Sequence, residues 1–145
     1  MSYLSGVTVH LTGEATSPLH ILQKLLDHGW TYNDQGSITY LPLGDREMYD
    51  WQQSPLDEWN TVNAVLESKI NANERIGMIL TWEDTLIGGD FHIAPSSQEV
   101  SVTWSVNRKV IEGGFTDHSW YLSKLLIPLT HSGMTISHFE CLDTL

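Results

Sequence analysis

Seven histidines and a single cysteine are the side chains of this sequence that most readily suggest metal or acid–base chemistry. A zinc site needs three or four His, Cys or carboxylate ligands, often with two on one element at close spacing. No histidine pair has that spacing on a predicted helix face, so the sequence predicts no metal site and ordinary hydrogen-bonded imidazoles instead. His10, His92 and His138 fall in predicted strands and could be neighbours in one sheet.

Sequence motifs of catalysis and of nucleotide binding are also missing. No Gly-x-Ser-x-Gly turn presents a nucleophilic hydroxyl, and no glycine-rich strand-to-helix turn is present to hold phosphates. The glycine pair at 88–89 lies between two predicted strands and indicates a turn. The adjacent carboxylates at 57–58 and 83–84 are typical of solvated groups, since acid–base pairs need pKa values separated by burial. We therefore expect a protein that is not an enzyme and binds no cofactor.

The net charge restricts the class of partner. Seven Lys and Arg residues against 18 Asp and Glu residues give a formal charge of −11. Such a charge repels phosphate backbones and anionic lipid surfaces, so we expect neither direct nucleic-acid binding nor a membrane partner. The same field would attract a basic protein. The alternative explanation, that negative charge simply keeps the chain in solution, stays open at this point.

Much of the charge gathers in residues 41–59, LPLGDREMYDWQQSPLDEW, where five carboxylates face one arginine. We predict a long connection that runs from a hairpin into a helix, and ordered long loops often carry function. Exposed aromatic rings often dominate binding energy, whereas carboxylates around them set the rate of approach. Alternatively, Tyr49 and Trp51 fold back as a lid over the core. A second acidic group at 83–90 would extend the patch if both loops share one end of the sheet. The predicted partner-binding residues are Asp45, Glu47, Tyr49, Asp50, Trp51, Asp57, Glu58, Glu83, Asp84 and Asp90.

The elements that must position these residues follow from hydrophobic periodicity and capping residues. Alternation over residues 7–11 predicts a strand, and a helix over about 18–28 begins after the N-cap Ser17 and ends before Gly29. A hairpin turn is predicted at 33–36. A second helix over about 55–71 takes Ser54 as its N-cap, and Trp59 lies on its core stripe.

Three strand-like runs follow at 75–84, 88–95 and 99–114, and they predict an antiparallel meander. A third helix over 117–129 is capped by Asp117 or Thr116 and should end or kink at Pro128. A last short strand over 134–142 contains Cys141, expected to be a small buried hydrophobe. The order β-α-β-β-α-β-β-β-α-β predicts an α+β fold, one largely antiparallel twisted sheet with about three helices packed on it. We expect residues 1–145 to form a single cytoplasmic domain, since no secretory signal or membrane span is evident.

The phrases HGWTYNDQGSITYLPLGD (28–45) and MILTWEDTLIGGDF (78–91), in a small acidic α+β chain without catalytic motifs, resemble the immunity proteins of bacterial polymorphic and contact-dependent toxin systems. The resemblance implies a stoichiometric inhibitor that binds the cognate toxin domain, commonly a basic nuclease, and blocks its active site or substrate face. One alternative is a small enzyme or ligand-binding domain with a pocket between sheet and helices. Another is a phage-encoded acidic inhibitor that mimics DNA.

Overall fold

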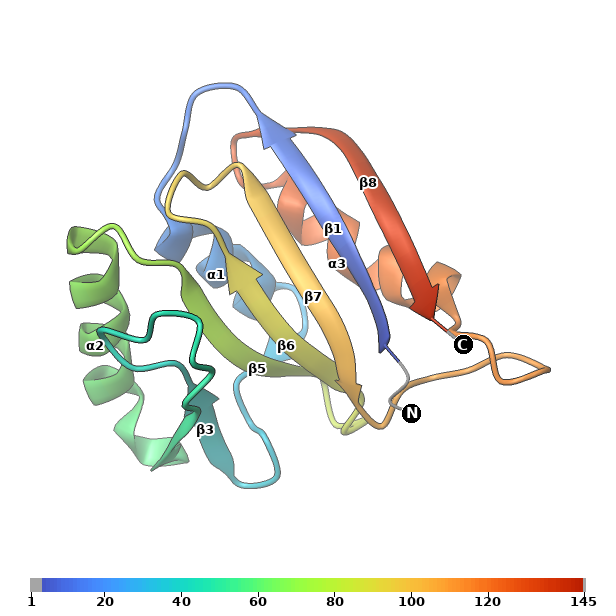
Figure 1. The fold of residues 1–145 in the computed structure, drawn as a ribbon, viewed down its shortest axis with the longest axis horizontal. Helices are drawn as coiled ribbons and strands as arrows, with labels where there is room; N and C mark the ends of the chain where they lie inside the picture. The colour runs from blue at the N-terminus through green and yellow to red at the C-terminus, as the bar shows by residue number, and fades with distance from the viewer. Residues whose placement is uncertain (1–3, 145) are drawn as a thin grey trace.

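One antiparallel sheet organises the molecule. The computed structural model describes residues 4–144, and Figure 1 shows their arrangement. The strands are β1 (Leu4–Thr12), β2 (Trp30–Thr31), β3 (Ser37–Tyr40), β4 (Gln52–Pro55), β5 (Ile76–Trp82), β6 (Gly88–Ile93), β7 (Glu99–Val106) and β8 (Thr135–Thr144). The helices are α1 (Pro18–Asp27), α2 (Trp59–Asn71) and α3 (His118–Thr130), with a 3₁₀ turn η1 at Leu56–Glu58 before α2.

The strands lie in the order β4-β3-β5-β6-β7-β1-β8. The short strand β2 is outside this order and pairs with the C-terminal end of β5. Every pairing is antiparallel, and the predicted meander is confirmed in β5, β6 and β7. The first strand of the chain, β1, lies between β7 and the last strand, β8. Residues from both ends of the sequence therefore meet in one half of the sheet.

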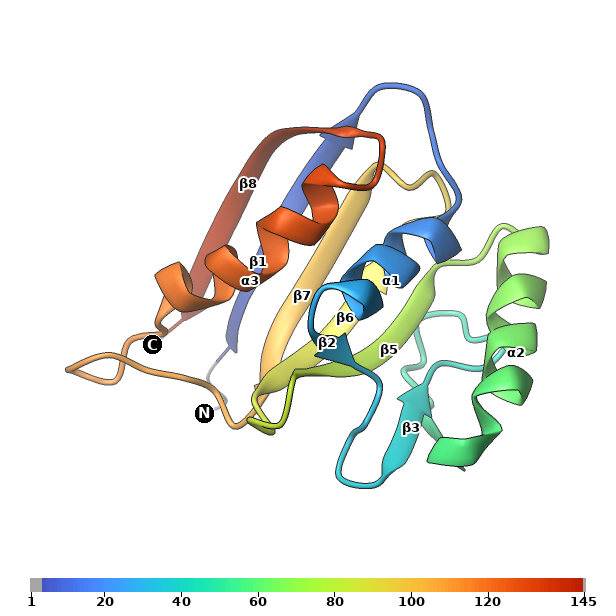
Figure 2. The same ribbon diagram turned by 180° about the vertical axis from the view of Figure 1, so that it is seen from behind.

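The two faces of the sheet differ in what covers them. The helices pack against one face, with α2 at the end of the sheet that holds β3, as the two opposite views show (Figures 1 and 2). Within residues 4–144 no helix lies on the other face. Alternation along each strand divides the side chains accordingly: Val7 and Val9 are buried under the helices, while Thr8 and His10 point to the uncovered face.

Aromatic rings join the sheet to the helices in the core. The Trp30 side chain is 1% exposed, its ring meets Phe91 edge-on, and its Nε1 donates a 3.0 Å hydrogen bond to the carbonyl oxygen of Lys124 on α3. The Phe91 ring also meets the Trp104 ring edge-on, and Trp104 stacks at 3.9 Å between centroids on Tyr121 of α3. These contacts fix the position of α3 on the sheet, because buried aromatic pairs prefer particular ring orientations in addition to the energy that burial of their surface provides.

The α+β prediction and its element order are confirmed, with the additional short strand β4. The predicted start of the second helix is wrong. Ser54 belongs to β4 and caps no helix; a 3₁₀ turn precedes α2, which begins at Trp59. A proline at the end of a short edge strand loses no inner hydrogen bond, and this is why Pro55 can end β4. Trp59 is partly buried and stacks on Tyr32 at 4.6 Å.

Two other local predictions have mixed outcomes. Asp117 is the N-cap of α3 and accepts a hydrogen bond from the Trp120 N–H, as expected, whereas the helix continues past Pro128 to Thr130. The expectation that Cys141 is buried is wrong: its side chain is exposed on β8, which is an edge strand of the sheet and is exposed along most of its length. Partial burial and the carboxylate of Asp143 raise the pKa of the Cys141 thiol.

Within residues 4–144, no helix is long and apolar enough to cross a lipid bilayer.

Candidate functional site

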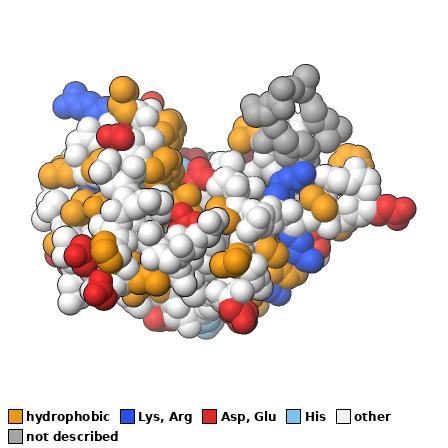
Figure 3. Space-filling model, turned by 90° about the horizontal axis from the view of Figure 1, so that it is seen from below, with side chains coloured by type: hydrophobic (Ala, Val, Ile, Leu, Met, Phe, Trp, Pro, Cys, Tyr) orange, Lys and Arg blue, Asp and Glu red, His pale blue; other side chains and the backbone are white. Residues whose placement is uncertain are grey.

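The uncovered face of the sheet is hollowed into a groove of about 650 Å³. Its walls combine the loop between β3 and β4 with outward-facing side chains of β6 and β7, among them Glu47, Tyr49, Asp90, His92, Glu99 and Thr103. The space-filling view from below shows the surface hollowed beside one raised part of the molecule (Figure 3). We call this hollow the acidic groove, since three of its lining residues are carboxylates and Arg75 is the one Lys or Arg among those that the structure describes.

Strand alternation explains which side chains face the groove. Phe91 and Ile93 of β6 point to the core, so Asp90 and His92 point the opposite way. Gly77 on the neighbouring strand leaves room beside them. A Cβ at Gly77 would overlap the side chain of Leu41 and would lie 3.3 Å from His92 Nδ1. The absent side chain thus allows the β3–β4 loop to pass close over the sheet.

A buried lysine anchors the start of that loop. The Lys69 side chain on α2 is 1% exposed, and its Nζ donates to the carbonyl oxygen of Pro42 at 2.7 Å and to Glu74 Oε1 at 3.2 Å. The same carboxylate oxygen accepts the Gly44 N–H at 2.9 Å. Charge-assisted hydrogen bonds of this kind are stronger than neutral ones. They hold residues 42–44 in place before the acidic part of the loop begins.

The loop then turns back over the groove through an unusual backbone. Glu47 and Tyr49 have φ angles of 62° and 54°, a region that residues other than glycine rarely adopt. Asp45 Oδ1 accepts the Asp50 N–H at 3.1 Å and closes this part of the loop. Strained residues persist only where surrounding contacts hold them, and they are frequent at binding and catalytic sites.

His92 lies at the centre of the contacts between loop and sheet. The ring centroids of Tyr49 and Trp51 are 6.0 Å and 5.9 Å from that of His92, and the Arg75 guanidinium lies 5.2 Å from the Tyr49 centroid. His92 Nε2 is 3.7 Å from Asp90 Oδ2. His92 Nδ1 is buried and has no hydrogen-bond partner within residues 4–144.

Two opposing effects act on the Asp90 carboxylate. Burial raises the pKa of Asp90, but the nearby His92 ring and a hydrogen bond from the Ser105 hydroxyl favour its charged form, so the pKa lies below its usual value. Asp90 is therefore a carboxylate at neutral pH and adds negative charge to the floor of the groove.

The order of these groups differs from that of a hydrolytic triad. In a triad the imidazole lies between hydroxyl and carboxylate and takes the proton of the nucleophile. Here the Asp90 carboxylate lies between the Ser105 hydroxyl and the His92 ring. Ser105 is consequently a donor that holds Asp90, and this arrangement suits the binding of a cation better than acyl transfer.

The structure brings six of the ten predicted site residues to the groove or its loop: Asp45, Glu47, Tyr49, Asp50, Trp51 and Asp90. Tyr49 is 49% exposed at the rim, whereas Trp51 is partly buried against His92. Tyr49 therefore agrees with the interpretation of an exposed ring, whereas Trp51 agrees with that of a ring folded back onto the protein.

Four predicted residues lie elsewhere. Asp57 and Glu58 follow β4 at the end where Pro55 pairs with Ser37, and Glu83 and Asp84 follow the far end of β5, where Trp82 pairs with Trp30. The loop over the groove instead joins β3 and β4 where Tyr40 pairs with Gln52 and Met78. The expectation that the second acidic group extends the first is correct for Asp90 and wrong for Glu83 and Asp84.

Sequence reasoning missed Arg75, His92, Glu99, Ser101 and Thr103 as groove residues. Period-2 alternation in β6 and β7 already indicated that His92, Ser101 and Thr103 face away from the core. What it could not show is that the uncovered face is concave at these positions.

Comparison with protein-family models, curated proteins and solved structures gives no match to this chain.

Proposed function

We propose that this protein is a toxin-neutralising immunity protein, which binds a cognate toxin domain through the acidic groove and its loop and so blocks the active site or substrate face of that toxin. The observation that carries the proposal is the loop at residues 45–51, which lines one side of an acidic groove with the half-exposed ring of Tyr49 and the exposed carboxylate of Glu47. A toxin that acts on nucleic acid needs a basic substrate face, and this groove is complementary to such a face.

The groove offers a basic partner both charge and a place to anchor. Asp90 is held as a carboxylate by His92 and Ser105, so a guanidinium or ammonium group that enters meets an oriented acceptor. The Tyr49 ring already holds the Arg75 guanidinium 5.2 Å from its centroid, and its other contacts leave half of the side chain exposed. Aromatic rings of this kind often supply much of the binding energy at an interface.

Capture of the partner tests the proposal. The tagged protein should co-purify, from cells that carry its native locus, with a basic protein in one-to-one ratio. One equivalent of the inhibitor should then abolish nuclease activity of the purified partner. Asp90→Asn combined with Glu47→Gln should weaken this complex. Asp57→Asn combined with Glu58→Gln also removes two charges, but at the opposite ends of β3 and β4 from the loop, and should not weaken the complex. Equal weakening by both pairs would contradict the groove as the binding site.

Two observations favour a second function. The groove has the volume of a small-molecule site, and the buried His92 Nδ1 lacks a partner within residues 4–144. A small ligand with one hydrogen-bonding group could satisfy this nitrogen. Specific binding of a metabolite, with no protein partner recovered, would favour the ligand-binding alternative. A basic partner encoded away from the inhibitor's own locus would instead favour the phage-type inhibitor.

A further inference from the structure

A second site lies on the same sheet face, at the opposite edge from the loop over the acidic groove. His10 on β1 and His138 on β8 are register partners, and their rings stack with centroids 4.2 Å apart and planes 13° apart. Both side chains point to the uncovered face, His10 partly buried and His138 exposed. Two imidazoles from neighbouring strands thus meet at one point of the surface.

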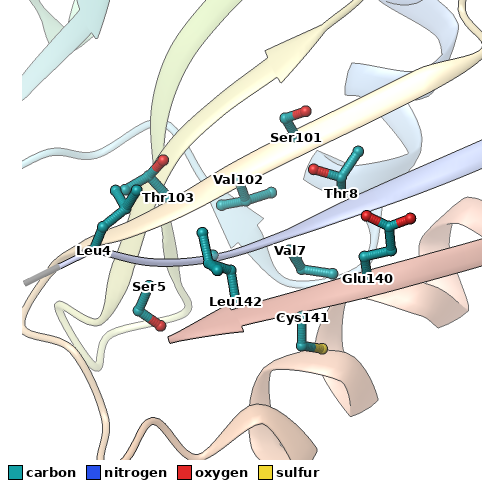
Figure 4. Close-up of a pocket in the computed structure, with 11 residues that line it drawn as sticks. Leu4, Ser5, Val7, Thr8, Ser101, Val102, Thr103, Glu140, Cys141 and Leu142 are labelled. Carbon is teal, nitrogen blue, oxygen red and sulfur yellow. The ribbon is translucent and has the colours of Figure 1, made fainter. Parts of the chain in front are cut away.

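Carboxylates flank the histidine pair on both sides. Glu140, two residues beyond His138 on β8, points to the same side as Thr8, as Figure 4 shows. One ligand atom from each of His10, His138 and Glu140 lies within 4.8 Å of the other two. On the inner side, Glu99 of β7 is the register partner of His10. Three adjacent strands therefore align two imidazoles and two carboxylates across the sheet.

We propose that His10, His138 and Glu140 bind one divalent transition-metal ion of the Zn²⁺ type. Two imidazole nitrogens and one carboxylate oxygen form a ligand set that Zn²⁺ accepts, with a fourth position left for water or a ligand from another molecule. Ser137 Oγ lies 3.1 Å from His138 Nδ1. This contact occupies Nδ1 and directs Nε2 of the same ring to the metal, as outer hydrogen bonds do in known sites.

Metal binding requires the stacked rings to turn. A metal ion lies in the plane of each ligating imidazole, and two parallel planes cannot share one ion between them. Rotation about χ2 of histidine is soft, and His138 and Glu140 are exposed, so the change meets little steric resistance. Glu140 also lines a hollow of about 260 Å³, together with Thr8 and Leu142.

The chain supplies its own control. His28 and His131 form another stacked pair, with centroids 4.8 Å apart and planes 17° apart. His28 Nδ1 is already 2.8 Å from the carbonyl oxygen of Lys24. No third His, Cys, Asp or Glu within residues 4–144 completes a ligand cluster there. Stacked histidines without an adjacent carboxylate should not bind the ion. The His28–His131 pair therefore tests whether ring stacking alone is enough for metal binding.

Calorimetric titration of the metal-free full chain with Zn²⁺ tests the site, and electron paramagnetic resonance of the Cu²⁺-loaded protein counts the nitrogen ligands. We expect one Zn²⁺ per chain and coupling to two imidazole nitrogens. His138→Ala and Glu140→Gln should each weaken Zn²⁺ affinity at least tenfold, and His131→Ala should leave it unchanged. Circular dichroism verifies that each variant is folded. Lack of one-to-one binding by the parent chain, coupling to a single nitrogen, or an equal loss in His131→Ala would overturn the proposal.

Discussion

At the residue scale, the charge on Asp90 depends on two neighbours that sequence alone did not connect to it. His92 lies two positions away on the same strand face, and Ser105 comes from β7. Both stabilise the carboxylate and lower the pKa of Asp90 against the opposing effect of burial. The folded state therefore binds a proton at Asp90 less readily than the unfolded chain does.

The pH dependence of stability follows from this shift. A lowered carboxylate pKa stabilises the folded state above about pH 4, and the contribution is lost as the pH falls through the lowered value. Asp90→Asn should reduce the free energy of unfolding by about 1 kcal/mol at pH 7, since a hydrogen-bonded charge is lost at a partly exposed site. Urea denaturation from pH 7 to pH 2 should show the two proteins converging in acid. A difference that stays constant over this range would contradict the assigned charge state.

Tyr49 and Trp51 should respond differently to truncation. Tyr49 is half exposed, so Tyr49→Ala should speed dissociation from the partner, at a cost of about 2 kcal/mol in binding, with little change in thermal stability. Trp51 packs against His92, so Trp51→Ala should reduce both binding and stability. Surface plasmon resonance and thermal melts separate the two effects. Equal loss of stability in both variants would mean that the rings form one lid.

The sequence predicted the acidic loop as a candidate site because charged and aromatic residues are adjacent there in the chain. It allowed His10 and His138 to be neighbours in one sheet but could not show that they pair, since those residues come from opposite ends of the chain and meet only through the β1–β8 register. The expectation of no metal site relied on spacing within one element. Ligands that meet across a sheet leave no such spacing.

At the element scale, α2 supports the acidic loop through one buried side chain. Lys69 holds Pro42 and Glu74, and Glu74 in turn holds Gly44. Lys69→Met should lower the free energy of unfolding by about 2–3 kcal/mol, less than a fully buried unpaired charge would cost, because Glu74 is partly exposed. Chemical denaturation measures this change. Lys24→Met, on the partly buried face of α1, is the matched control and should change stability by less than about 0.5 kcal/mol.

A double variant shows whether the effect arises from the ion pair. Lys69→Met combined with Glu74→Gln removes both charges and should recover part of the lost stability, because no carboxylate is left without its cation. If the double variant is as unstable as the sum of the single variants, the two charges are not coupled and Lys69 acts through its hydrogen bond to Pro42.

Helices and strands with clear periodicity were predictable, and β4 was not. The residues Gln52–Pro55 form it only because β3 provides a partner, and their own sequence contains no alternation of apolar and polar side chains. On sequence alone, the same four residues are equally compatible with the segment that precedes and caps a helix. Pairing with β3 makes these residues a strand and not the start of a helix, and the local sequence does not indicate this pairing.

At the scale of the whole molecule, the distribution of charge matters more than its sum. Neutralising Asp45, Glu47 and Asp50 as amides should slow association with the partner and flatten its salt dependence, since steering by charge raises association rates about 10–10³-fold. Neutralising Asp57, Glu58 and Glu83 changes the net charge equally, but these residues follow the ends of β4 and β5 that lie away from the loop. Stopped-flow association at several ionic strengths compares the two. The same slope for both triple variants would show that only net charge counts.

The position of β1 between β7 and β8 has a consequence for synthesis of the chain. β1 leaves the ribosome before both of its neighbours and stays unpaired until β7 and then β8 have emerged, and closure of the sheet then joins residues 89 to 140 positions apart. Contacts this distant in sequence slow folding. Until they form, the apolar side of β1 is open to chaperones and to aggregation, and any mutation that delays β8 prolongs that interval.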